Sequence, residues 1–407
     1  MELNVDAAGA RPCPEPSISS ALALLFAVAC GLAVANVYYA QPLLDTLADT
    51  FGIRPATVGI VITITQIGYG LGLLMVVPLG DLVDRRRLIV GQSLLSVVAL
   101  LAVALAPSAS ILLPAMAAVG VLAVVTQVLV AYAASMAAPG ERGRVVGTVT
   151  SGIIIGILLA RAVSGTLSDL FGWRSVYLAS AAATLVVSGL LWMVLPRQAR
   201  PAAGISYLQL IRSVFALFAQ EPVLRIRAVL AMLIFMAITM LLTPMVLPLT
   251  APPFSLSHTQ VGLFGLAGAA GALGAARAGR QSDRGRAQRT TGIGLTVMLL
   301  SWALIAMLPW SIWAMVAGVV AIDFGLQSVH VANQSLIYRV RPEAQSRLTA
   351  GYMIFYSIGS ATGSMASTMV YAHAGWNGVC LAGAFVSAVA LAFWALTRHL
   401  TPQDASP

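Results

Sequence analysis

Long apolar segments recur along nearly the whole chain, with short polar segments between them. Each has about the 20 residues that a helix needs to cross roughly 30 Å of hydrocarbon. None shows the strict alternation over about ten residues that is typical of membrane β-strands. The pattern predicts an all-α membrane protein with twelve transmembrane helices near 19–45, 56–79, 88–106, 111–137, 145–168, 174–195, 225–249, 259–278, 291–308, 312–338, 348–371 and 377–397.

Composition supports this interpretation. Of 407 residues, 59% are hydrophobic and 9% are charged, whereas soluble domains carry roughly 25% charged residues. A water-soluble surface cannot be built from so few charges. The net charge of +9 comes from 23 basic residues that are all arginine, and these cluster in short loops. Arginines there set the orientation of a membrane protein, so no nucleic-acid partner is predicted.

The side on which the arginines fall predicts the orientation. If the N-terminus is cytoplasmic, nearly all arginines outside the spans lie on the cytoplasmic side, and only Arg54 and Arg174 lie outside. Such asymmetry follows the positive-inside rule. Both termini are therefore predicted to be cytoplasmic.

The chain contains an internal duplication. "GWRSVYLASA" (172–181) aligns with "GWNGVCLAGA" (375–384), 203 residues further on, and "GDLVDRRR" (80–87) matches "GRQSDRGR" (279–286). Two six-helix halves in parallel repeat are a transporter plan, with the substrate site near the midplane between the halves. We expect a cytoplasmic tail (1–18), a first half (19–195), a cytoplasmic linker with an amphipathic surface helix (196–222), a second half (223–398) and a cytoplasmic tail (399–407).

These motifs resemble those of the major facilitator superfamily. Gly80, Leu82, Asp84 and Arg85 match its loop signature between the second and third helices. The fifth helix resembles the signature of the bacterial twelve-helix drug:proton antiporters, since it carries Gly147, Gly156, Ala160, Arg161, Ser164 and Gly165 at the same spacing. Ala160 and Ser164 replace glycines, and Arg161 stands where proline is expected. The resemblance implies the major facilitator fold in a bacterial cytoplasmic (inner) membrane.

Two charges lie deep within predicted helices. A charge at the bilayer centre costs roughly 2.5–3.5 kcal/mol on insertion scales and is functional by default. One is Arg161; the other is Asp323, which shares a helix face with Gln327 and His330. We expect this face to line a wet cavity. The alternatives are a structural hydrogen-bond network and, for His330, a satisfied interior histidine.

Further polar residues are candidates for the same proton and substrate cavity. Aromatic walls with a few placed amides suit a mostly apolar ligand, although tyrosines near helix ends also anchor helices at the interface. The candidates are Asn36, Tyr38, Tyr39, Gln41, Gln66 and Gln127.

Charged loop residues are candidates for a cytoplasmic gate. The matched loops of the two halves place aspartates beside arginines, which can pair when that side closes. Topology alone explains the arginines, but acidic residues contribute little to orientation. The gating candidates are Gly80, Asp84, Arg85, Asp283 and Arg284.

The sequence predicts a monomeric, proton-coupled secondary transporter that exports small amphipathic organic compounds by alternating access. It has no GxxxxGK[ST] nucleotide motif, and no enzyme activity, cofactor or metal is predicted. We hypothesise that Arg161 pairs alternately with Asp323 and with substrate or water. The alternatives are an organic-anion carrier that uses Arg161 to bind a carboxylate, and a non-transporting sensor or scaffold.

Overall fold

The structure is a bundle of helices arranged in two halves. The computed structural model describes residues 19–138, 141–196, 206–341 and 345–401, and these residues contain no β-strand. The first half comprises α1 (Ser20–Tyr38), η1 (Gln41–Leu43), α2 (Leu44–Phe51), η2 (Pro55–Thr57), α3 (Ile60–Met75), η3 (Val77–Asp81), α4 (Arg85–Ala104), α5 (Ala109–Ala123), α6 (Val125–Met136), α7 (Arg142–Phe171) and α8 (Trp173–Val194).

A linking helix and the second half follow. The segment predicted to hold an amphipathic helix contains α9 (Tyr207–Gln220); its place on the membrane surface stays a prediction. The second half comprises α10 (Pro222–Leu242), α11 (Val246–Thr250), α12 (His258–Leu263), η4 (Phe264–Ala267), α13 (Gly268–Asp283), α14 (Ala287–Ala306), α15 (Ile312–Val340), α16 (Gln345–Thr397) and η6 (Arg398–Leu400).

The helices agree with the predicted twelve spans, although their bounds differ. In the described part of the chain, ten helical spans are long and apolar enough to cross a membrane. One of them, Arg347–Leu400, holds the two last predicted helices, which are separated at Gly375 by a non-helical backbone. The eighth predicted helix consists of α12, η4 and α13. The first span continues past the predicted end at residue 45 to Phe51, through the 3-10 turn that contains Pro42.

The backbone shows the duplication. Gly172 and Gly375, which are 203 residues apart, both have positive φ angles, 81° and 62°. Glycine adopts this conformation without the steric cost that other residues meet, so each half turns sharply between its last two helices. The tryptophan that follows each glycine, Trp173 or Trp376, is buried.

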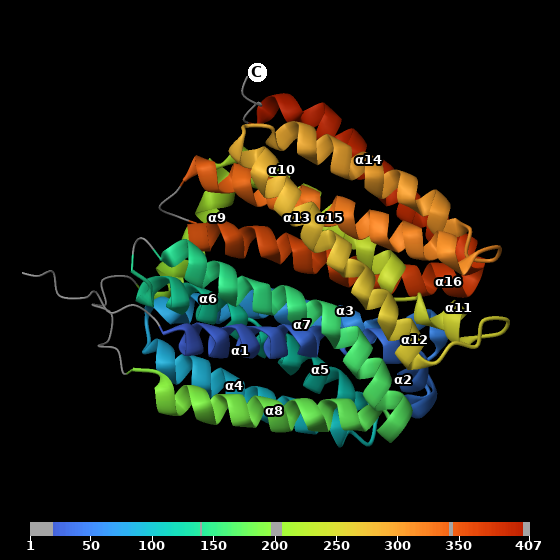
Figure 1. The fold of residues 1–407 in the computed structure, drawn as a ribbon, viewed down its shortest axis with the longest axis horizontal. Helices are drawn as coiled ribbons and strands as arrows, with labels where there is room; N and C mark the ends of the chain where they lie inside the picture. The colour runs from blue at the N-terminus through green and yellow to red at the C-terminus, as the bar shows by residue number, and fades with distance from the viewer. Residues whose placement is uncertain (1–18, 139–140, 197–205, 342–344, 402–407) are drawn as a thin grey trace, which may run out of the picture.

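The two halves lie side by side (Figure 1), the first drawn in blue to green and the second in yellow to red. We call the end where α1 begins the first end, and the end that holds α2, α11 and α12 the second end. Hydrogen bonds between the halves gather toward the second end. Thr63 Oγ1 donates to the Ala361 carbonyl (2.9 Å) and Ser364 Oγ to the Gly59 carbonyl (3.2 Å), which joins α3 and the turn before it to α16.

Candidate functional site

A cluster of aromatic rings joins the two halves at the centre of the bundle. The hydroxyls of Tyr38 on α1 and Tyr356 on α16 are hydrogen bonded at 2.8 Å. The Tyr356 ring meets the ring of Tyr69 on α3 edge to face, with centroids 6.1 Å apart, and that of Phe235 on α10, 4.2 Å apart. We call these four residues the central aromatic cluster. It provides an apolar wall with hydroxyls that can orient a ligand.

Arg161 lies directly beside this cluster. Its side chain on α7 is buried, its guanidinium carbon is 5.5 Å from the centroid of the Tyr38 ring, and its Nε donates to Gln41 Oε1 at 2.7 Å. Among the described residues, no hydrogen-bond acceptor contacts its two terminal nitrogens. Because a guanidinium carries five N–H donors, the side that faces away from Gln41 retains the fork that binds carboxylates.

Asp323 lies near Arg161 but does not contact it. The carboxylate, on α15, is buried, and within the described part of the chain it forms neither a hydrogen bond nor an ion pair. The two groups are close enough for each to act on the other through Coulomb's law. The hypothesised direct pair is thus not formed in this conformation, and the alternation between pairing and release stays a prediction.

Glycines on the eighth predicted helix allow this approach. A Cβ on Gly265 would lie 3.0 Å from the Cβ of Arg161, and one on Gly268 would lie 3.3 Å from Asp323 Oδ2. Small residues permit such close helix packing in membranes. A single helix therefore brings together a charge from the first half and a charge from the second.

His330 and Gln327 extend from Asp323 along α15. His330 Nδ1 is hydrogen bonded to the Tyr352 hydroxyl at 2.9 Å, and its ring meets that of Phe235 at 5.3 Å. Gln327 is half-buried, and its Cγ lies 2.9 Å from where a Cβ on Gly271 would be. His330 therefore has a partner and an aromatic neighbour, as the interior-histidine alternative expects, while it also borders the central aromatic cluster.

Two predicted amides also border this cluster. Gln66 is buried, and its Oε1 has no hydrogen-bond partner in the described residues. Gln127 Nε2 donates to the Tyr69 hydroxyl at 3.4 Å. An unpaired buried acceptor is costly, so Gln66 is a group that a ligand or a water would satisfy.

Asn36 and Tyr39 lie within the first half instead. Ser180 Oγ donates to Asn36 Oδ1 at 2.6 Å, and the Tyr39 carbonyl accepts from Ser164 Oγ at 2.7 Å. The Tyr39 ring meets the Tyr177 ring edge to face. The structure thus does not bring these two side chains to the central aromatic cluster, because consecutive residues at the end of α1 point in different directions.

The proposed gate residues lie at the first end. Asp84 is the N-cap of α4 and accepts a hydrogen bond from the Arg86 backbone N–H at 2.8 Å. Arg85 Nε donates to the Gly80 carbonyl and its Nη1 to Ser135 Oγ, both within the first half. Arg284 is exposed in the turn after α13, and the side chain of Asp283 lies outside the described part. Pairing across the halves stays a prediction.

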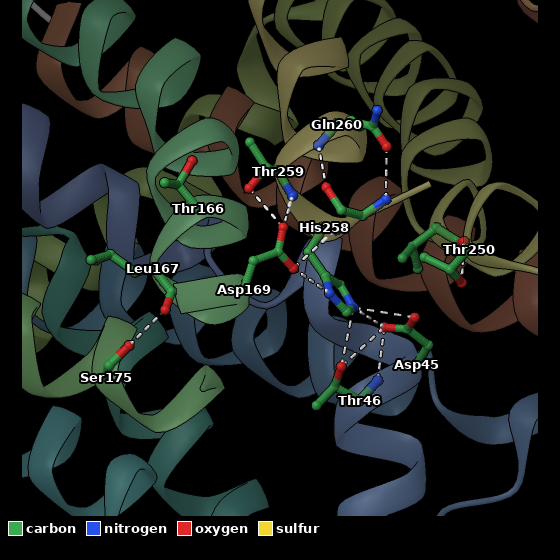
Figure 2. Close-up of polar contacts among 12 residues, drawn as sticks. Asp45, Thr46, Thr166, Leu167, Asp169, Ser175, Thr250, His258, Thr259 and Gln260 are labelled. Carbon is green, nitrogen blue, oxygen red and sulfur yellow. Dashed lines mark hydrogen bonds and ion pairs between the residues drawn. The ribbon is translucent and has the colours of Figure 1, made fainter. Parts of the chain in front are cut away.

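One polar cluster was missed by sequence reasoning. At the second end, the imidazole of His258 on α12 lies between the carboxylates of Asp45 on α2 and Asp169 on α7 (Figure 2). Hydrogen bonds and ion pairing with Asp45 and Asp169 raise the pKa of His258. Ser257 and Gln260 form a capping box at the start of α12, a signal that predicts a helix start but not the partners of the histidine.

Comparisons with known proteins agree with this architecture. The family model "Major Facilitator Superfamily" matches residues 24–275 and 228–407. The "Uncharacterized transporter YgaY" of Escherichia coli O157:H7 is 46% identical over 381 residues, which cover 94% of this chain and 96% of the relative. The "Probable transporter SCO4007" of Streptomyces coelicolor is 32% identical over 364 residues, covering 89% and 84%.

Solved structures share the fold. A bacterial homologue of the human lysosomal transporter Spinster, in an inward-facing and unoccupied conformation, superposes with a TM-score of 0.77 at 16% identity, covering 95% of this chain and 98% of that one. The nucleoside transporter NupG gives a TM-score of 0.73 at 15% identity, covering 92% and 99%. The chain is an all-α membrane transporter that belongs to the Major Facilitator Superfamily.

Proposed function

We propose that this protein is a proton-coupled exporter of small amphipathic organic compounds, that both termini lie in the cytoplasm of a bacterial cell, and that the first end faces that cytoplasm. The halves meet at the second end and at the central aromatic cluster, which is the arrangement of an alternating-access carrier closed toward the outside. The substrate would bind against the tyrosines between the halves.

The observation that carries the proposal is the pair of buried, opposite charges without direct contact. Asp323 has no hydrogen-bond partner in the described residues, and its nearest opposite charge, Arg161, keeps two terminal nitrogens unbonded there. A carboxyl that moves between water and a buried site changes its affinity for protons. Arg161 cannot lose its proton, so Asp323 is the group that exchanges protons while Arg161 remains a fixed charge.

A second candidate is the transport of organic anions. It is favoured by the unbonded side of the Arg161 guanidinium, which has the geometry that binds a carboxylate through two parallel hydrogen bonds. The orphaned acceptor of Gln66 nearby would take a donor from the same ligand. The two candidates share the cavity and differ only in the charge of the substrate.

Proteoliposomes with a trapped pH-sensitive dye test both candidates. Ethidium, an amphipathic cation, and benzoate, a small anion, serve as probes against an imposed pH gradient. We expect the wild-type protein to move protons when a transported probe is added, and Asp323→Asn to abolish this flux while probe binding persists. Asp49→Asn, which changes an exposed carboxylate on α2, is the matched control.

The outcomes separate the candidates. Flux with ethidium supports the exporter of amphipathic compounds, and flux with benzoate alone supports the anion carrier. Proton flux in Asp323→Asn at the wild-type rate, with either probe, removes Asp323 from the mechanism. If the uptake rate of a transported probe does not change with the imposed pH gradient, proton coupling is rejected.

A further inference from the structure

We infer that His258, Asp45 and Asp169 form a second proton-binding site, and that proton uptake there closes the second end of the transporter. We call these three residues the outer latch. The inference rests on alternating access, as proposed above, but not on Asp323 or on the identity of the substrate.

The outer latch connects three elements and both halves. Nε2 of His258 lies 3.0 Å from Oδ1 and 3.3 Å from Oδ2 of Asp45, and Nδ1 lies 3.0 Å from Oδ1 of Asp169 (Figure 2). Asp45 and Asp169 belong to the first half, on α2 and α7, and His258 begins α12 of the second half. Separating the halves at this end therefore breaks both contacts.

The geometry favours a protonated imidazole. A neutral imidazole has one N–H and donates to one partner, while its other nitrogen presents a lone pair. Here each ring nitrogen faces a carboxylate oxygen, so only the imidazolium satisfies both contacts. In the neutral ring Nδ1–H still donates to Asp169, and the Thr46 hydroxyl, 3.1 Å from Nε2, can donate to the lone pair there. Asp45 then loses its N–H donor, and the two carboxylates repel across the ring without a positive charge between them.

Neighbouring groups hold both carboxylates in place. Asp169 Oδ2 accepts from the Thr259 backbone N–H at 2.7 Å and from the Thr259 hydroxyl at 2.6 Å, which ties it to the first turn of α12. Asp45 Oδ1 accepts from the Thr46 backbone N–H at 2.7 Å. These contacts hold both carboxylates against the imidazole, so loss of the proton leaves two negative charges beside a neutral ring.

No other charge in the described surroundings substitutes for the proton. Of the elements packed against α12, η1, η4 and α11 carry no charged residue there. On α7, Arg161 directs its Nε to Gln41, and on α2, Asp49 adds a further negative charge that is exposed. The field at His258 is therefore negative, consistent with its raised pKa.

The outer latch is open to water. The side chains of His258 and Asp45 are each 22% exposed and that of Asp169 is 25% exposed. Protons therefore reach the imidazole from the second end without crossing the central aromatic cluster. If that end faces outward, as the arginine distribution indicates, an acidic exterior closes the outer side.

The direction of the pH effect follows from linkage. The pKa of His258 is raised in the closed form, so the closed form binds the proton more tightly than an open form in which the partners have separated. Protonation of His258 stabilises the closed form fully below the pKa that the histidine has in the open form. This stabilisation is lost as pH rises through the pKa of His258 in the closed form. Each pKa unit between the two forms multiplies the closed-to-open ratio by about ten.

Spin labels at the second end test this without any substrate. Thr50→Cys on α2 and Asn377→Cys on α16 place one exposed label on each half, in a protein whose Cys13, Cys30 and Cys380 are replaced by serine. Double electron–electron resonance measures the distance between the labels in nanodiscs from pH 5 to pH 9. We expect a short-distance population at low pH that declines, and a longer one that grows, as pH rises.

Variants link the effect to the outer latch. His258→Gln should abolish the pH dependence, and Asp45→Asn or Asp169→Asn should shift its midpoint to lower pH. His373→Gln is the matched control, because His373 is an exposed histidine on α16 whose Nδ1 contacts the carbonyl of Met369 in the same helix, away from any carboxylate among the described contacts. It should behave like the wild type.

Two results would overturn the inference. One is a wild-type distance distribution that does not change over this pH range; the other is an unaltered pH dependence in His258→Gln or, should that variant not fold, in both aspartate variants. Neither result bears on Asp323→Asn, whose proton flux is measured separately, so the latch and the proposed function can fail independently.

Discussion

Replacing Arg161 by alanine should stop transport with only a modest loss of stability of the fold. The substitution removes the hydrogen bond from Nε to Gln41 Oε1 and the contact with the Tyr38 ring. It also removes the fixed positive charge that acts on Asp323 through Coulomb's law. Arg161→Lys keeps the charge but lacks the planar fork, so we expect it to retain part of the activity.

The stability terms nearly cancel. A hydrogen bond to a charged group is worth about 1.5–3 kcal/mol, and a cation–π contact about 0.5–2 kcal/mol. Against this, removing a charge from the apolar interior relieves roughly 2.5–3.5 kcal/mol. These three terms together change the free energy of unfolding by about 2 kcal/mol or less, and the lost attraction between Arg161 and Asp323 adds to the destabilisation. Loss of a charge-assisted bond to an anionic ligand would instead weaken its binding about 10- to 150-fold.

Thermal unfolding in detergent and flux in proteoliposomes separate these effects. Arg174→Ala is the matched control. Like Arg161, Arg174 donates a hydrogen bond, to the Ala106 carbonyl at 3.1 Å, and lies over an aromatic ring, that of Trp173 at 4.4 Å. Unlike Arg161, it lies away from the central aromatic cluster. It should transport normally. Wild-type flux in Arg161→Ala would refute a role in transport, and a variant that does not fold would show that the arginine is structural.

A double substitution measures the coupling between the two deep charges. Arg161→Ala leaves Asp323 without its nearest opposite charge, and adding Asp323→Asn removes that cost. We expect the double variant to express better than Arg161→Ala alone. Because the two groups do not touch, the gain should be smaller than the roughly 4 kcal/mol of a pair at about 4 Å and an effective dielectric constant of about 20. Equal expression of the single and double variants would refute the coupling.

Two further predictions concern the ends of the bundle. Asp84→Asn should keep the cap of α4, because asparagine caps as well as aspartate, whereas Asp84→Ala should lower the free energy of unfolding by about 1 kcal/mol. If the charge of Asp84 gates the first end, both variants should slow flux equally. Normal flux in Asp84→Asn would reject a gating role. Gly262→Ala should place a Cβ against the Arg161 carbonyl, lower stability by about 1–3 kcal/mol and lengthen the label distance at the second end. An unchanged melting temperature of Gly262→Ala would contradict the predicted loss of stability.

The sequence by itself determined that the chain lies in a membrane, that it is helical and that it is duplicated. A chain with 9% charged residues and repeated apolar segments satisfies its backbone in lipid only through helices or closed barrels. The repeat at 203 residues predicted equivalent turns, and Gly172 and Gly375 share a positive φ in the structure. These features are local in the chain, so composition and periodicity are sufficient to predict them.

The sequence also singled out Arg161 and Asp323, because a charge in lipid is costly wherever it lies. It did not predict their partners. Gln41 is 120 positions from Arg161 along the chain, and helical spacing defines only which residues share a face, not which helix meets that face. Asn36 and Tyr39 illustrate this limit, since they turn into the first half while Tyr38 between them reaches the second.

Only the tertiary structure revealed the outer latch. Asp45, Asp169 and His258 come from three distant segments, and each by itself resembles an ordinary polar residue near a helix end. They meet because Gly165 on α7 lets the backbone of His258 approach closely, and because the halves close at that end. The charge of a histidine between two carboxylates depends on distances of about 3 Å, and helix packing across the two halves decides such distances, whereas local sequence does not.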